Sequence, residues 1–466
     1  MAGAAVEEGR FRKGDLFGHV TRMSLTSAVG LSALFLVDFA DMLFISMLGK
    51  AALAAAVGYA GTILFFTISL GIGLAIAAGA VVARAIGAEG PGAARSHTGH
   101  VLIHAVAVSA AAALLILFFL EPVTTLVGAA GETQALAIGY LAIVVPSLPV
   151  LVAGMVAGAV LRAHGDARRA MWSTLAGGLV NALLDPLLIF GLGLELTGAA
   201  LASVAARFVI AGWALHALAT HHGGLGRPRL AGVLADLRPV MAIAVPAIMT
   251  QLATPVGMGF VLRSMAAHGE SAVAGMAVIM RLTPLAFVAL FALSGAIGPI
   301  VGQNAGAGDY ARVRGAWRAG LAFTGLYTLA VAALLFALRH PLADLFGAIG
   351  PMRDLILLFC GPVALLWVFN GVIFTANAAF NNLGRPYWST WLNWGRHTLG
   401  TVPFVLAGGA LAGAEGVLVG QAIGGAVFAA AAVLLVRRAI AEGGRPPPRP
   451  PFARQARLMR LFSLRR

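Results

Sequence analysis

The sequence predicts an all-α membrane protein with twelve transmembrane helices in two parallel six-helix repeats around a central cavity. Hydrophobic residues make up 60% of its 466 positions, charged residues only 11%, and the mean hydropathy is +0.91. A soluble domain carries about 25% charged residues. The chain has 59 Gly and 21 Pro and lacks the alternating pattern of barrel strands, so a helical bundle is expected. The single cysteine, Cys360, excludes an internal disulfide.

Twelve apolar segments, bounded by charged residues or by Gly and Pro clusters, are each long enough to cross a membrane, which takes about 20 residues. They cover residues 24–48, 51–83, 96–120, 134–161, 171–190 and 197–220, then 239–267, 271–303, 313–338, 354–380, 388–407 and 412–436. We therefore predict a tail over 1–22, an N-lobe over 23–220, a linker over 221–238, a C-lobe over 239–438 and a Pro- and Arg-rich tail over 439–466.

The distribution of Lys and Arg predicts the orientation, because short cytoplasmic loops collect these residues. With a cytoplasmic N-terminus, the outer loops hold only Lys50, Arg339 and Arg353. We expect both termini and the linker to be cytoplasmic, in the cell (inner) membrane. The net charge of +14 then faces anionic lipid rather than nucleic acid. Residues 453–466 predict either a basic amphipathic helix on the membrane or a disordered basic tail.

A constant offset of 219 residues relates the two halves. It aligns residues 86–88 with 305–307, Gly165 with Gly384, and Trp172 with Trp391. Six spans is an even number, so the copies are parallel repeats, a design that places a substrate cavity between two rocking halves. Repeats can also build channels and membrane enzymes, but no HExxH or GxSxG motif and no P-loop is present, so an enzyme is not expected.

Three acidic residues, Asp38, Asp41 and Asp185, lie well inside predicted spans of the first half. An ionised Asp at the bilayer centre costs about 2.5 to 3.5 kcal/mol, which makes such residues functional candidates. Asp38 and Asp41 share a helix face, as do Asn181 and Asp185. If the first and fifth spans adjoin, these side chains form one cluster that carries a proton or holds a sodium ion. The alternative is polar contacts that only link helices.

The second half has no counterpart of these acids, since the offset takes Asp41 to Phe260 and Asp185 to Phe404. Its one strong charge within a span is Arg396. This side chain is expected to face a water-filled cavity, to contact a neighbouring Trp ring, or to reach the membrane interface from a helix end.

Three histidines, His97, His100 and His104, lie at helical spacing where the third span begins. Their position at the interface favours solvated side chains over a metal site. No metal other than a monovalent cation at Asp41, Asn181 and Asp185 is therefore predicted.

Five short motifs, in this order, resemble the multidrug and toxic compound extrusion (MATE) family. They are Asp41-Met-Leu-Phe-Ile-Ser-Met-Leu-Gly49, Leu161-Arg162-Ala-His-Gly165-Asp166, Asn181-Ala-Leu-Leu-Asp185-Pro186, Gly198-Ala-Ala-Leu-Ala-Ser203 and Gly302-Gln303-Asn304-Ala-Gly306-Ala307-Gly308. The resemblance implies a coupling-ion site at Asp41, Asn181, Asp185 and Ser203. The missing second-half carboxylate resembles the DinF-like branch, which works through its N-terminal lobe. Asp38 is an additional acid beside this set.

We therefore expect a monomeric secondary antiporter that exports cationic or amphipathic small molecules and is driven by proton or sodium entry, with no cofactor beyond the coupling ion. One alternative is a flippase for lipid-linked or polysaccharide precursors. Such a protein is expected to have a more cationic cavity, for which only Arg207, Arg281 and Arg396 are available. The other alternative is a pore.

Overall fold

The computed structural model describes residues 8–226 and 228–443, which are almost entirely helical. The first half contains η1 (Arg10–Arg12), α1 (Leu16–Met47), α2 (Ala51–Glu89), α3 (Pro91–Phe118), α4 (Leu120–Leu126), α5 (Gly131–Val144), η2 (Val145–Ser147), α6 (Leu148–Ala163), α7 (Ala167–Pro186), η3 (Leu187–Gly191) and α8 (Glu195–His221). The second contains α9 (Leu230–Ala266), α10 (Glu270–Ala286), α11 (Val288–Gly306), α12 (Tyr310–Leu345), α13 (Gly350–Leu358), η4 (Phe359–Val363), α14 (Ala364–Asn382), α15 (Pro386–His397) and α16 (Val402–Ala441).

The described residues make the twelve predicted passes. Eleven helical stretches are long and apolar enough to cross a membrane, and the last of them, Pro386–Ala441, comprises two passes. The chain reverses within α16 at Ala412 and Gly413, where Gly413 adopts a φ of 58° that favours glycine. The predicted spans 388–407 and 412–436 are the two arms of this hairpin.

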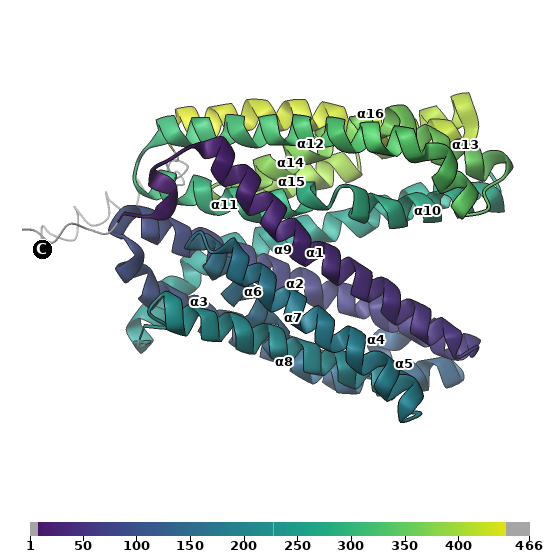
Figure 1. Cartoon of the computed structure of the whole chain (residues 1–466), viewed down its shortest axis with the longest axis horizontal. Helices are drawn as coiled ribbons and strands as arrows, with labels where there is room; N and C mark the ends of the chain where they lie inside the picture. The colour runs from purple at the N-terminus through teal and green to yellow at the C-terminus, as the bar shows by residue number, and fades with distance from the viewer. Residues whose placement is uncertain (1–7, 227, 444–466) are drawn as a thin grey trace, which may run out of the picture.

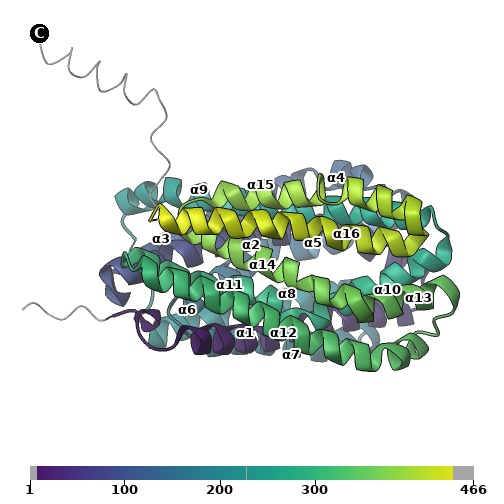
Figure 2. The same ribbon diagram turned by 90° about the horizontal axis from the view of Figure 1, so that it is seen from above.

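The 219-residue offset holds for the helices themselves. α3 and α12 begin at Pro91 and Tyr310, and α7 and α15 begin at Ala167 and Pro386. Two copies of one arrangement therefore form the two lobes, which Figure 1 and Figure 2 show side by side.

Several helices extend beyond the predicted spans, because a helix continues through polar residues that a hydrophobic window excludes. α1 begins at Leu16, where the Asp15 side chain accepts hydrogen bonds from the backbone N–H groups of Phe17 and Gly18. α9 begins at Leu230, inside the predicted linker. The predicted eighth span is divided into α10 and α11 at Phe287. The predicted membrane helix or tail over 453–466 lies outside the described residues.

The equivalent helices α1 and α9 each pack on both lobes. The first half of α1 adds Val20 and Met23 to the core of the C-lobe, whereas Ile45 near its end packs in the N-lobe. α9 adds Val240 to the N-lobe core and Val261 to the C-lobe core. Figure 1 shows α1 crossing obliquely from one lobe to the other. A change in the angle between the lobes must therefore move these two helices.

The lobes meet at one end of the molecule, where α2 crosses α11. A Cβ atom built on Gly87 would lie 1.9 Å from the carbonyl oxygen of Gln303, and one on Gly306 would lie 2.2 Å from that of Arg84. These glycines let the two backbones touch. Both ends of the described chain lie at this same end, on the left in Figure 1.

Residues 9–14, which we call the strap, cover this contact and bond to both lobes. Phe11 is 1% exposed, and its backbone N–H donates to Gln303 Oε1 over 2.9 Å. Gln303 Nε2 donates in turn to the carbonyl oxygen of Ala163 over 2.7 Å. Arg10 Nη1 donates to the carbonyl oxygen of Gly165 over 3.1 Å. The strap therefore stabilises the closed contact between the lobes.

Candidate functional site

The structure brings the acidic candidates together inside the N-lobe. Asp41 on α1 and Asp185 on α7 lie within hydrogen-bonding reach of each other. Asp38, one turn before Asp41, is near enough to interact with its charge. Asp185 is fully buried and Asp41 half-buried, whereas Asp38 is exposed. The cluster forms because α1 packs along α7, the adjacency that the sequence left conditional.

These carboxyl groups lack the partners that buried charges need. Asp41 Oδ1, both Asp185 oxygens and Asn181 Nδ2 are buried with no hydrogen-bond donor or acceptor among the described residues. Two carboxylates share a hydrogen bond only when one of them carries a proton. An uncompensated buried charge is strongly unfavourable. The arrangement is therefore suited to binding a proton or a small cation.

Tyr140 and Ser203 extend the cluster. The hydroxyl of Tyr140 on α5 is hydrogen-bonded to Ser203 on α8, and its ring lies close enough to sense the charges of Asp41 and Asp185. Ser203 thus lies beside the cluster, next to Tyr140. The sequence patterns do not single out Tyr140. A phenol in an otherwise apolar span is the signal that could have identified it.

Arg207, one turn after Ser203 on α8, is satisfied by other groups. Its Nη1 donates to the carbonyl oxygen of Val144 over 2.8 Å and to Ser147 Oγ over 2.9 Å. No ion pair joins it to the buried acids within the described chain. The acids therefore retain their need for a positive partner.

Arg396 lies in the C-lobe and is 9% exposed, so the expectation that it reaches the interface is wrong. Its Nη1 donates to Asn370 Oδ1 over 2.6 Å, and its Nη2 lies 2.7 Å from His397 Nε2. The two cation–π contacts found in the described residues involve Arg339 and Arg385 instead. The guanidinium belongs to a polar network between α14 and α15, which tertiary packing creates by bringing these helices together.

An aromatic cluster that the sequence patterns did not reveal faces the boundary between the lobes. The rings of Phe287 and Trp367 are stacked at 4.7 Å, and Phe291 contacts both Trp367 and Phe374. Phe35 on α1 lies 6.4 Å from Phe291, edge to face. Aromatic faces bind apolar molecules and organic cations.

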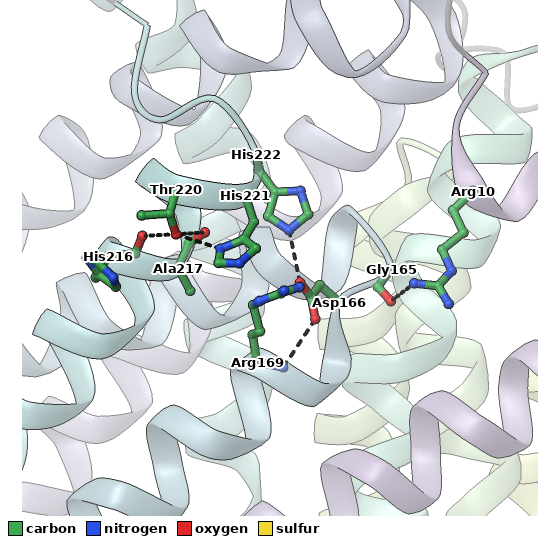
Figure 3. A network of polar contacts seen from close by, with 9 residues as sticks. All are labelled: Arg10, Gly165, Asp166, Arg169, His216, Ala217, Thr220, His221 and His222. Carbon is green, nitrogen blue, oxygen red and sulfur yellow. Dashed lines mark hydrogen bonds and ion pairs between the residues drawn. The ribbon is translucent and has the colours of Figure 1, made fainter.

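A separate polar network holds the turn between α6 and α7 (Figure 3). Asp166 accepts from Arg169 Nη1 at 2.5 Å and lies 3.1 Å from His222 Nε2. Burial opposes ionisation of Asp166, but the hydrogen bonds from His222 and Arg169 outweigh it and lower its pKa below the usual range. Burial and the stacked His222 ring lower the pKa of His164 to about 4. This network fixes the turn on which the strap rests.

Comparison with known proteins agrees with this architecture. The chain is 28% identical to the FAD transporter of Shewanella oneidensis, over 89% of this chain and 93% of that protein. It is 25% identical to the multidrug export protein MepA of Staphylococcus aureus, over 91% and 94%. The crystal structure of the Vibrio cholerae MATE transporter VcmN, 24% identical, superimposes with a TM-score of 0.87 over 92% of this chain and 97% of that one.

The family match repeats the internal symmetry. A model of the MatE family matches residues 27–187 and again residues 246–406, and the second match begins and ends 219 residues after the first. Both matches lie within the helical lobes and together cover more than half of the chain. The chain therefore belongs to the MATE family of membrane transporters.

Proposed function

We propose that this transporter is an antiporter that exports cationic or amphipathic small molecules in exchange for an entering proton or sodium ion. The observation that carries the proposal is the set of buried, unpartnered oxygens of Asp41 and Asp185 beside Asn181. Asp38 and Ser203 lie next to this set. Loading the cluster with a cation removes an uncompensated buried charge, so the ion favours whichever lobe arrangement holds the cluster together.

Coupling follows if the substrate and the ion favour different arrangements of the lobes. Asp41 lies on α1, the helix that spans both lobes, so its ion state can bias how that helix packs. We propose that loading the cluster weakens substrate binding and that release of the ion restores it. In the same proposal, the end carrying the strap faces the cytoplasm of the inner membrane, and the monomer in its lipid is the working unit.

The proposal is tested by substituting the two acids with their neutral isosteres. Purified protein in proteoliposomes is given a fluorescent organic cation and an imposed pH gradient, then a sodium gradient. Asp41→Asn and Asp185→Asn should each reduce gradient-driven uptake at least tenfold, because neither amide can bind and release the ion. The gradient that supports uptake by the unsubstituted protein identifies the coupling ion.

A matched control is Asp344→Asn, which neutralises an exposed acid whose partner is Arg353. This variant should transport as the unsubstituted protein does. Equilibrium binding of the fluorescent cation, measured by polarisation, separates loss of coupling from loss of folding. Full gradient-driven transport by Asp41→Asn would refute the assignment of the cluster.

The substrate class rests on the aromatic cluster of Phe291, Trp367 and Phe374, which offers flat apolar faces without a fixed positive charge among its members. The same assay with FAD, the compound named for the Shewanella relative, is the informative contrast. Uptake of FAD in place of the organic cation would contradict the proposed class while leaving the ion site intact.

A further inference from the structure

Two histidines of α3 and one aspartate of α9 converge near the end of the molecule where the lobes meet. His97 Nδ1 and His100 Nδ1 each lie 2.7 Å from the same oxygen, Oδ2 of Asp236. One potential ligand atom from each residue lies within 4.8 Å of the others. His100 is only 7% exposed, so the expectation of solvated histidines is wrong for this residue. The sequence places Asp236 well over a hundred positions from its partners, and only the packing of α9 on α3 unites them.

Close backbone contacts hold this arrangement. A Cβ atom on Gly232 would lie 2.5 Å from His100 Cε1, so the imidazole packs directly on the backbone of α9. A second histidine, His104, lies 2.8 Å through its Nε2 from the carbonyl oxygen of Val233. These contacts fix α9 against α3 and aim Asp236 at His97 and His100, which are one helical turn apart.

We propose that His97, His100 and Asp236 form a binding site for a divalent transition-metal ion, with Zn²⁺ as its representative. Two imidazole nitrogens and one carboxylate oxygen are a ligand set of three-residue zinc sites, which complete their tetrahedron with water. Nitrogen ligands select zinc, nickel or copper over magnesium and calcium.

The geometry is close to what such an ion requires. Zinc lies about 2.0 Å from His nitrogen and from carboxylate oxygen, so tetrahedral ligand atoms are separated by about 3.3 Å. The nitrogen-to-oxygen distances here are 2.7 Å. An ion therefore enters after the side chains separate by about 0.6 Å. His97, whose side chain is 31% exposed, provides the solvent-facing side for entry.

The competing explanation is a hydrogen-bonded triad in which both imidazoles donate Nδ1–H to Asp236. The two explanations differ in chemistry, since metal binding needs unprotonated Nδ1 atoms and releases any protons they carry. They also differ in consequence. A bound ion would link the N-lobe to α9, the first helix of the C-lobe, and so restrain the helix that packs on both lobes.

The experiment uses the full-length protein in detergent, with any affinity tag removed and residual metal stripped by a chelator. Zinc binding is measured by competition with a chromophoric chelator, and cobalt substitution supplies the visible absorption of a tetrahedral site. We expect one equivalent of zinc and a Tm that rises on adding it. His97→Ala with His100→Ala should weaken binding more than 100-fold, because loss of outer-shell partners alone costs 10- to 100-fold. Asp236→Asn, which preserves side-chain shape, should weaken binding at least tenfold.

The matched control is His216→Ala with His221→Ala, which removes two exposed histidines of α8. It should bind zinc as the unsubstituted protein does. Equal zinc affinity in the His97/His100 double variant would overturn the site, as would absence of stoichiometric binding in the unsubstituted protein at micromolar zinc. Because the readouts are binding and Tm, failure of the antiport proposal would leave this result unaffected.

Discussion

Replacing Gly87 with alanine should open the contact between the lobes. The added Cβ would lie 1.9 Å from the carbonyl oxygen of Gln303, whereas ordinary contacts begin near 3.4 Å. The obstacle is backbone on a facing helix, so no side-chain rotation can relieve it. α2 and α11 must therefore separate by roughly 1.5 Å at this crossing, by difference of the two distances.

The cost applies only to conformations in which the two helices touch. Overpacking typically costs about 1 to 3 kcal/mol, and a clash between backbone atoms belongs at the upper end of that range. Since each 1.4 kcal/mol is a factor of ten, about 3 kcal/mol changes the ratio of closed to open conformers by roughly 100-fold. Molecules that are mostly closed at this end would become mostly open.

Spin-label distances across the two lobes measure this shift. The chain has a single cysteine, the buried Cys360, so a Cys360→Ala background accepts reporter cysteines cleanly. Labels at Arg168 and Arg314, both exposed on opposite lobes near the closed end, should report longer distances in Gly87→Ala. Gly79→Ala is the matched control on the same helix, because its Cβ would meet Ala159 at an ordinary 3.7 Å. An unaltered distance distribution in Gly87→Ala would refute the reasoning.

Three further substitutions test the network around the closed end and the buried arginine. Gln303→Leu leaves a buried N–H and a buried carbonyl without partners, at about 1 to 3 kcal/mol each, and should speed hydrogen exchange of the strap; unchanged exchange would contradict the role of this side chain. His164 has a pKa of about 4 and stays neutral when folded, while the unfolded chain takes up its proton below about pH 6.5, so stability should fall by up to about 3 kcal/mol as the pH drops from about 6.5 to 4. In His164→Gln the Tm should lose this part of its pH dependence, and an identical pH profile would count against it. Asn370→Leu removes an acceptor from the Arg396 guanidinium and should cost about 1.5 to 3 kcal/mol, seen as a lower Tm; an equal Tm would mean that water replaces the amide.

The spans and the repeat could be predicted because they depend on local composition. A membrane helix needs a run of apolar residues, and that run is visible without knowing its neighbours. The ends were less accurate, since α1 and α9 continue through charged residues that no hydropathy pattern assigns to a helix. The break between α15 and α16 at residues 398–401 was also missed, because that stretch is neither strongly polar nor interrupted by proline.

The candidate site was predictable only in part, because its members come from different helices. Asp41 and Asp185 were identified by the cost of burying a carboxylate, a property of each residue alone. Tyr140 and Asp236 acquire their significance from packing: one lies beside the acids only because α5 packs on α8, and the other meets its histidines only because α9 lies on α3. No spacing in the chain encodes either contact.

The asymmetry between the lobes has a packing cause as well as a chemical one. The offset takes Asn181 to Gly400, where α16 folds back so closely that a Cβ on Gly424 would lie 1.3 Å from the Gly400 carbonyl oxygen. A Cβ on Gly400 itself would lie 2.7 Å from the carbonyl oxygen of Arg396. An amide side chain at this position has no room, so the C-lobe could not regain the cluster by restoring the polar residues alone. Where the N-lobe keeps space for unpaired carboxylates, the C-lobe uses the equivalent space for helix contact. One scaffold thus supplies an ion-responsive lobe and a rigid lobe against which it can move.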